Sequence, residues 1–206
     1  MPKGNCDRRI RDISYRYGSD TVLSHFSYTF EKGFIYGITA PSGTGKTTLL
    51  NLIGNILKPA QGEIETDFKT GIAYVFQEPE LLSQLTIAEN IALPLATYLK
   101  KEIAFEQAIS LLQQMEMDGF ENRFPNELSF GQQQRAAIAR ALTYPSPLLL
   151  MDEPFKGLDE ALSRRIIKRI RERQTENGQT ILFTSHNPGE LRLFADKTVR
   201  LDPTSH

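Results

Sequence analysis

The sequence predicts an α/β protein with a mainly parallel β-sheet, a small N-terminal antiparallel β region and an inserted helical segment. Residues 148–151 and 180–184 are apolar runs of strand length, and residues 160–175 between them have helical periodicity. This strand–helix–strand alternation is typical of parallel sheets. Residues 13–30 are instead rich in aromatic and β-branched types around a turn at residues 17–20, which favours short antiparallel strands.

The other elements follow from local patterns along the chain. Residues 34–39 and 72–76 are short apolar runs of strand type, and residues 47–57 have helical spacing that Lys58 and Pro59 end. Residues 87–119 are mostly helix formers with helical periodicity, interrupted at Pro94. We therefore expect one domain over residues 1–206, with 1–82 and 146–206 forming the core and 83–145 forming a helical subdomain.

Composition excludes several classes of protein. With 206 residues, 40% hydrophobic and 24% charged, the chain can bury a sizeable core. A formal charge of -1 and a pI of about 6.3 give no global field for a nucleic acid or an anionic membrane. Cys6 is the single cysteine, so an internal disulfide and a thiolate metal cluster are excluded and a reducing cytoplasm fits best. The first ten residues make no secretory signal, and no run of about 18 apolar residues predicts a membrane span.

The stretch APSGTGKTT joins a predicted strand to a predicted helix, which is the setting of a phosphate-binding loop. Glycines at 43 and 45 let backbone amides turn toward phosphate oxygens, while the lysine reaches the outer phosphates and the first threonine can ligate Mg²⁺. Alanine stands where the strict pattern opens with glycine, which is tolerable if φ is negative there. The alternative is a glycine-rich turn before a helix. The candidate nucleotide-binding residues are Ala40, Pro41, Ser42, Gly43, Thr44, Gly45, Lys46, Thr47 and Thr48.

Two acids end the apolar run at residues 147–154. Asp152 is expected at the carboxyl end of a strand, where ligands of open parallel sheets bind, and can hold Mg²⁺ directly or through water. Glu153 is then free to orient and polarise an attacking water, as a base does in nucleotide hydrolysis. The alternative is an acidic turn after a core strand. Together with the phosphate loop, the pair predicts a P-loop NTPase core.

A third motif is LSFGQQQR at residues 128–135. Ser129 and Gln132 have the Ser-x-x-Gln spacing of a helix capping box, and a helix N-terminus is also an anion site. In this order the motifs resemble the nucleotide-binding subunit of an ATP-binding cassette (ABC) transporter, whose signature usually reads Leu-Ser-Gly-Gly-Gln followed by x-Gln-Arg. Phe130 replaces the first signature glycine, so its ring is expected either to pack against a partner or to hinder closure. Gln133 falls at a variable position and is interpreted as exposed helix surface.

The resemblance implies roles for further residues of this chain. Gln77 matches the lid glutamine that reaches toward Mg²⁺ and the attacking water, and His186 matches the switch histidine that contacts the γ-phosphate. Tyr17 matches the aromatic residue that stacks on adenine, with Tyr15 as the rival. Residues 157–159 match the loop by which two subunits sense one another, although alanine more often precedes Leu-Asp. The implied catalytic residues are Glu153, His186 and Gln77, and the implied metal ligands are Thr47, Gln77 and Asp152.

The resemblance also implies how such a subunit works. Two ATPase subunits, identical or different, are expected to pair head to tail, so that Ser129, Gly131 and Gln132 of one close over the ATP and Mg²⁺ held by the other. Separate transmembrane permease subunits would hold the pair at the cytoplasmic face of the cell membrane. Stretches at residues 74–95 and 148–159 are similar to importer ATPases of the nitrate, sulfonate and taurine type, and an importer implies a solute-binding protein.

Three other functions remain open from the sequence. A small P-loop kinase shares the phosphate loop but has no reason to contain the signature. An exporter motor shares every motif. A soluble ABC clamp in DNA repair or translation could use the basic residues of the segment at 160–175, although nearby acids favour a solvated face and no nucleic acid is expected. The basic residues are Arg164, Arg165, Lys168, Arg169, Arg171 and Arg173.

Overall fold

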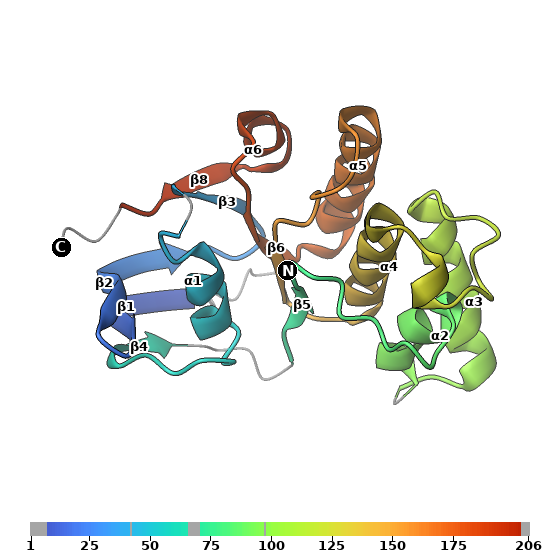
Figure 1. Ribbon diagram of the computed structural model, residues 1–206, viewed down its shortest axis with the longest axis horizontal. Helices are drawn as coiled ribbons and strands as arrows, with labels where there is room; N and C mark the ends of the chain where they lie inside the picture. Colours follow the sequence, from blue (N-terminus) through green and yellow to red (C-terminus); the bar gives the residue numbers. More distant parts are fainter. Residues whose placement is uncertain (1–7, 42, 66–70, 97, 203–206) are drawn as a thin grey trace.

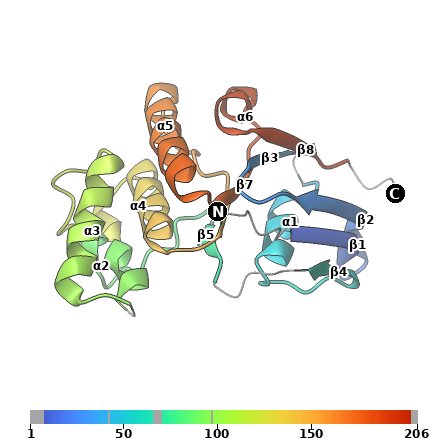
Figure 2. The same cartoon turned by 180° about the vertical axis from the view of Figure 1, so that it is seen from behind.

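The computed structural model describes residues 8–41, 43–65, 71–96 and 98–202. A small antiparallel sheet lies at one end of the molecule, a parallel sheet lies in the middle, and a group of helices lies at the other end (Figure 1). The view from behind shows the same order (Figure 2). This arrangement confirms the predicted fold class.

Three strands form the antiparallel sheet, in the order β2-β1-β4. Their bounds are Arg8–Tyr17 for β1, Asp20–Phe30 for β2 and Gln61–Glu65 for β4. Tyr17 pairs with Asp20 across the tight turn that the sequence predicted. The predicted antiparallel region is therefore confirmed, but β1 begins earlier than expected and β4 was not predicted.

Five parallel strands form the central sheet, in the order β5-β6-β7-β3-β8. Their bounds are Ala73–Val75 for β5, Leu148–Asp152 for β6, Thr180–Thr184 for β7, Ile35–Thr39 for β3 and Lys197–Arg200 for β8. Every residue of β6 and β7 is buried, as expected of strands covered on both faces. Thr184 pairs with Asp152 on one side and with Ile38 on the other, so the carboxyl ends of β6, β7 and β3 meet at one edge.

The two faces of this sheet belong to different cores. On β7, Leu182 packs in a cluster with Leu49 of helix α1 (Lys46–Ile53) and with Ile13 of the antiparallel sheet. Its neighbour Phe183 points the opposite way, into a cluster with side chains of α4 (Phe130–Thr143) and α5 (Glu160–Asn177), such as Ile138. Fully burying one such side chain stabilises the fold by roughly 1.5–3 kcal/mol. Helices α1 and α4 are therefore held on opposite faces of the sheet.

Helix α1 spans Lys46–Ile53 and is shorter than the predicted helix at residues 47–57. The chain turns at Asn55, whose φ is 59°, and the amides of Ile56 and Leu57 both donate to the carbonyl oxygen of Asn51 at 2.9 and 3.1 Å. Leu57 still packs on the core, which explains why the apolar periodicity continues past the end of the helix.

Helices fill the chain between β5 and β6. These are α2 (Ile87–Ala92), a 3₁₀ turn at Leu93–Leu95, α3 (Lys101–Gln114), a second 3₁₀ turn at Pro125–Glu127, and α4 (Phe130–Thr143). The break expected at Pro94 is the first 3₁₀ turn. Helices α2, α3 and α4 contact one another, while the predicted limits of a helical subdomain at residues 83 and 145 remain a prediction. Among the described residues, no helix combines the length and the apolar character that crossing a bilayer requires.

The last third of the chain adds two helices. Helix α5 (Glu160–Asn177) connects β6 to β7, and the carboxylate of Asp159 caps it by accepting from the amide of Leu162 at 2.9 Å. Helix α6 (Pro188–Phe194) then leads to the edge strand β8. The sequence predicted α5 but neither α6 nor β8.

Glu116, just after α3, joins three helices. Its carboxylate accepts from Arg165 of α5 at 2.8 Å and pairs with Arg169 at 3.2 Å, while its carbonyl oxygen accepts from Arg135 of α4 at 2.6 Å. The hydrogen bond from Arg165 lowers the pKa of the Glu116 carboxyl below its ordinary value. Because this pKa is lower in the folded chain, the stabilisation is present above the unfolded pKa and is lost as pH falls through the folded pKa.

Glu116→Gln is therefore expected to lower the free energy of unfolding by about 1 kcal/mol at neutral pH. The difference from the wild-type chain should shrink below the ordinary glutamate pKa of about 4.3. Urea unfolding at neutral pH and below the ordinary glutamate pKa measures the loss of stability and its change with pH. Glu106→Gln, at an exposed position of α3, is the control. Equal losses in the two variants, or a loss that does not change with pH, would show that the pairs at Glu116 add no stability.

Candidate nucleotide site

The loop between β3 and α1 leaves a helix N-terminus uncapped. Gly45 is the N-cap residue of α1, has φ 90° and supplies no side-chain hydrogen bond to the first turn. A Cβ at Gly45 would lie 2.6 Å from Cγ1 of Val22 on β2, so only glycine fits both the backbone and the space. The free amides and the helix dipole together favour an anion here.

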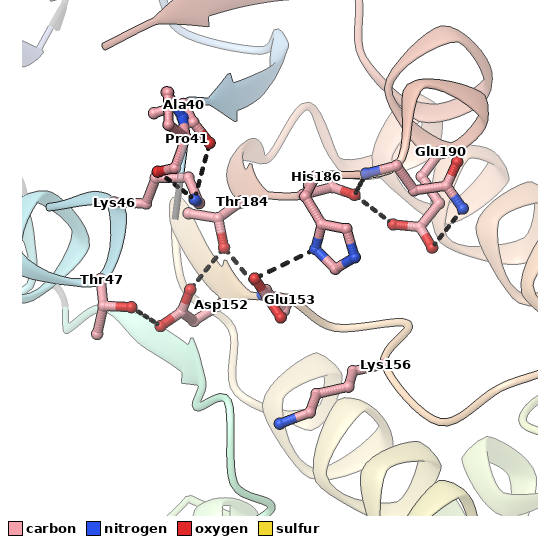
Figure 3. Close-up of polar contacts among 12 residues, drawn as sticks. Ala40, Pro41, Lys46, Thr47, Asp152, Glu153, Lys156, Thr184, His186 and Glu190 are labelled. Carbon is pink, nitrogen blue, oxygen red and sulfur yellow. Dashed lines mark hydrogen bonds and ion pairs between the residues drawn. The ribbon is translucent and has the colours of Figure 1, made fainter. Parts of the chain in front are cut away.

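Lys46 folds back over this loop. Its Nζ donates to the carbonyl oxygens of Ala40 at 3.0 Å and Pro41 at 3.3 Å, as Figure 3 shows. Ala40 is not among the described residues with positive φ, which meets the condition for alanine at that position. Ser42 lies outside the described residues. Because these contacts hold the ammonium against the loop, an anion bound by the loop would meet its charge directly.

The predicted carboxylate Asp152 ends β6 and is 2% exposed. Its two oxygens accept from the hydroxyls of Thr47 at 2.6 Å and Thr184 at 2.5 Å. Burial, and then the negative charge of Asp152, raise the pKa of Tyr74 far above its ordinary value. Thr47 and Asp152 thus bring a hydroxyl and a carboxylate together, which are oxygen donors of the kind that Mg²⁺ binds.

Glu153 is held in an unusual backbone conformation beside this pair. Its φ is 46°, which costs a non-glycine residue of order 1–3 kcal/mol. The amide of Glu153 donates to the hydroxyl oxygen of Thr184 at 2.9 Å, so the hydroxyl that donates to Asp152 also fixes Glu153. His186 places Nδ1 3.4 Å from Oε1 of Glu153 (Figure 3). Four predicted residues, Thr47, Asp152, Glu153 and His186, are thereby brought together.

Gln77 follows β5 by two residues. Since Val75 pairs with Met151 on β6, the segment after β5 leaves the sheet at the same edge as Asp152 and Glu153. Arg140 of α4 holds this segment by donating to the carbonyl oxygens of Glu80 at 2.8 Å and Pro79 at 3.2 Å. The half-buried Gln77 therefore lies on a loop that Arg140 of α4 holds in place.

The signature residues lie elsewhere. Ser129 and Gln132 form the predicted capping box, with the Ser129 amide donating to Oε1 of Gln132 at 2.8 Å and the Gln132 amide donating to the Ser129 hydroxyl oxygen at 3.4 Å. Ser129 is exposed and keeps its own hydroxyl hydrogen for a further acceptor. Helices α1 and α4 lie well apart in both views, with the central sheet between them (Figures 1 and 2). The chain's own signature is therefore not part of its own phosphate loop.

The family of the chain is decided by comparison. The family model described as ABC transporter matches residues 23–156. The chain belongs to the ABC transporter ATPases. This ABC subunit is 36% identical to thiamine import ATP-binding proteins from Shigella boydii and Escherichia coli, over 93% of this chain and 86% of each relative.

Solved structures agree with this assignment. A dimeric post-hydrolysis state of the ATP-binding cassette MJ0796 bound to ADP and Pi has a TM-score of 0.87 and 30% identity, covering 95% of this chain and 94% of that one. A second dimeric structure of the same cassette has a TM-score of 0.86 at 30% identity, covering 94% of each chain. The chain is an ATP-binding, ATP-hydrolysing subunit of the ABC type.

Sequence reasoning missed residues that position the predicted groups of this ABC subunit. Thr184 contacts both acids, yet only the register of β6 against β7 places it there. The hydroxyl of Ser185 donates to Glu190 at 2.5 Å and accepts from the amide of Asn187 at 2.9 Å, which fixes the turn around His186. The available signal was a polar residue at the end of a fully buried strand, Thr184, followed directly by a second one, Ser185.

Tyr17 and Tyr15 differ in what their rings can reach. Tyr17 is 53% exposed at the end of β1, whereas Tyr15 is half-buried against the core, and the ring centroids lie 5.0 Å apart at 79°. If Tyr17 stacks on adenine, Tyr17→Ala should weaken ATP binding by about tenfold, since base–aromatic stacking contributes about 1–3 kcal/mol. Tyr15→Ala is the matched control and should mainly lower the free energy of unfolding. Equilibrium titration with ATP compares the two, and a larger affinity loss for Tyr15→Ala would show that the platform is misplaced.

Proposed function

We propose that this subunit hydrolyses MgATP as half of a head-to-tail pair and thereby drives import of a small solute through separate membrane permease subunits. The observation that carries the proposal is the cluster at the carboxyl edge of the sheet. There the hydroxyl of Thr47 and the strained Glu153 are both tied to the buried Asp152, Thr47 directly and Glu153 through Thr184.

Each residue of the cluster has a distinct task in this proposal. Lys46 and the amides at the start of α1 bind the phosphates of ATP. The oxygens of Thr47 and Asp152 fit Mg²⁺, which would neutralise charge on the phosphates, and Gln77 would complete the site from its loop. Glu153 accepts a hydrogen bond from the attacking water and orients it in line with the γ-phosphate. His186, held next to Glu153, donates to the phosphoryl oxygens as charge develops on them.

The opposite subunit supplies the rest of the site. Ser129, Gly131 and Gln132 begin a helix whose exposed N-terminus favours an anion. Since these residues lie on the other face of the sheet from the phosphate loop, a second subunit must bring its own copy to close over the γ-phosphate. The dimeric form of the similar cassette supports this arrangement.

Import is supported by the named relatives, which are thiamine import ATP-binding proteins. The cargo contacts other chains, so the resemblance to nitrate, sulfonate and taurine importers stays a prediction, as does a solute-binding partner. Three exposed apolar side chains, Leu82, Leu93 and Tyr98, follow Gln77 along the chain. Exposed apolar surface favours a protein partner, and we place the permease there, at the cytoplasmic face of the membrane.

A nucleic-acid clamp has less support, because the cations of α5 are engaged by other groups. Arg164 pairs with Glu160, Arg165 and Arg169 with Glu116, Lys168 with Glu172 and Arg171 with Asp196, while Arg173 donates to the carbonyl oxygen of Leu142. Such paired charges are typical of a solvated helix face.

Phosphate release by the purified chain tests the hydrolytic proposal. With ATP and Mg²⁺ alone, we expect turnover that chelation of Mg²⁺ abolishes and that rises more steeply than linearly with protein concentration, because two subunits form each site. Turnover that required an added phosphate acceptor would instead indicate a kinase.

A further inference from the structure

Two departures from the usual family pattern touch one another in the folded chain. Phe130 stands where the signature usually has glycine, and Gly157 stands where alanine is more common. A Cβ added to Gly157 would lie 2.7 Å from Cδ1 of Phe130 and 3.3 Å from Cε1, and Gly157 has φ 78°. The half-buried ring of Phe130 therefore occupies the space that a side chain at residue 157 would need.

The first turn of α4 rests on this loop by its backbone as well. A Cβ added to Gly131 would lie 2.6 Å from the carbonyl oxygen of Gly157. The loop itself is formed by two turns, in which the amide of Lys156 donates to the carbonyl oxygen of Glu153 at 3.1 Å and the amide of Leu158 donates to that of Phe155 at 3.2 Å. Gly157 is thus held at a fixed position relative to Glu153.

Lys156 extends the contact to the loop of Gln77. Its Nζ lies 5.5 Å from the centroid of the Phe130 ring and 3.5 Å from Oε1 of Glu78, the residue after Gln77. In Figure 3 the Lys156 ammonium points away from Glu153 and His186. Both charged side chains are exposed to solvent, so the ion pair itself adds little to stability. Its contribution is to hold the lysine over the ring.

We propose that Phe130, Lys156 and Gly157 form a clamp in which Phe130 is a positioning residue. The ring fixes Ser129 and Gly131 on the loop that follows Glu153, Gly157 makes room for the ring, and Lys156 ties it to the segment of Gln77. This inference rests on the proposed function of Ser129 and Glu153. In the paired enzyme the clamp links the residues that close over the partner's ATP to the residues that act on the chain's own ATP.

The clamp predicts that substitutions at residues 130 and 157 are coupled. Gly157→Ala forces a methyl group against the ring and should lower kcat by about tenfold, a size typical of coupling between neighbouring residues. The KM for ATP should stay within about twofold, because the phosphate loop is untouched. Removing the ring makes room for the methyl group, so Phe130→Ala combined with Gly157→Ala should recover most of the loss that Gly157→Ala shows alone.

Gly119→Ala is the matched control for backbone strain. Gly119 has φ 82°, close to that of Gly157, but a Cβ there would meet nothing within 4 Å. It reports the cost of placing alanine in this conformation without a clash.

Lys156→Met should lower kcat with little change in KM, whereas Lys156→Arg, which keeps the cation over the ring, should retain activity.

Urea unfolding of the wild-type chain, the two single variants Phe130→Ala and Gly157→Ala, and the double variant keeps this test separate from that of the proposed function. Coupling between the two substitutions in the free energy of unfolding supports the contact even in a chain that hydrolyses no ATP. A lack of ATP hydrolysis would count against the proposed function alone. Active wild-type protein in which Gly157→Ala and Gly119→Ala have equal effects, or in which Phe130→Ala and Gly157→Ala add independently in both measurements, would overturn the clamp.

Discussion

Glu153→Gln is expected to reduce the rate of ATP hydrolysis by about 10²–10⁴-fold, the usual contribution of a positioned base, while ATP binding is retained. Glutamine has the shape of glutamate and can occupy the same backbone position, fixed by the hydrogen bond from its amide to Thr184. It cannot take up a proton from water. The variant should therefore accumulate as an ATP-bound dimer, seen as a larger species in size-exclusion chromatography when ATP is present.

Glu80→Gln is the control for this substitution. Glu80 is an exposed glutamate with the same φ of 46°, so the two variants place glutamine in the same backbone conformation. Phosphate release and equilibrium ATP binding are measured for both. Undiminished hydrolysis by Glu153→Gln, or an equal loss in Glu80→Gln, would show that Glu153 does not act on the water.

Lys46→Met is expected to weaken ATP binding by about 10–100-fold, since hydrogen bonds to charged groups contribute about 1.5–3 kcal/mol. The ammonium now donates to the carbonyl oxygens of Ala40, in a part-buried contact, and of Pro41, in an exposed one, and both acceptors belong to the loop itself. The fold should thus tolerate the change. Titration with ATP measures the affinity, and thermal unfolding without nucleotide checks the fold.

Lys101→Met, at the start of α3, is the control for loss of one exposed cation. It should leave the affinity for ATP unchanged. If both lysine variants bind ATP like the wild-type chain, the ammonium of Lys46 does not meet the phosphates and the loop has been misassigned.

Local signals explain what could be predicted from the sequence. The phosphate loop and the capping box of α4 each depend on residues within one short stretch, so composition and spacing were enough. Asp152 and Glu153 were found because two acids directly follow a buried apolar run. Thr184 was missed because its contacts depend on the register between two strands distant in sequence.

Short elements left too little pattern to predict. Helix α6 has seven residues, and β8 has four, of which only Val199 is buried, so neither shows a clear period. The interpretation of Gln133 as exposed helix surface is wrong. Gln133 is half-buried, and its side-chain Nε2 donates to the carbonyl oxygens of Pro125 at 2.8 Å and Leu128 at 3.2 Å. Those acceptors face it because a 3₁₀ turn folds back onto α4, which spacing alone does not reveal.

The expectation for Phe130 was divided between a contact with a partner and a hindrance to closure. In the folded chain Cδ1 and Cε1 of the ring lie against Gly157 of the same subunit, and Nζ of Lys156 lies 5.5 Å from the ring centroid. Gly157 itself departs from the usual family pattern. The role of Phe130 could therefore be interpreted only once its contact with Gly157 was known.

Mixing two inactive variants tests the head-to-tail site most directly. Lys46→Met disables the phosphate loop, and Ser129→Arg places a large cation at the exposed start of α4, where the signature must approach the partner's ATP. Each variant alone has no intact site. A mixed dimer has one, because its unaltered Lys46 and Ser129 come from different subunits and face each other.

The account predicts that equal amounts of the two variants, mixed and allowed to exchange subunits, recover up to about one quarter of wild-type phosphate release. Half of the dimers are then mixed, and each has one of its two sites intact. If each site were completed within a single chain, every subunit in the mixture would still be defective. Phosphate release that stays at the level of the separate variants, with mixed dimers shown to form, would contradict the account.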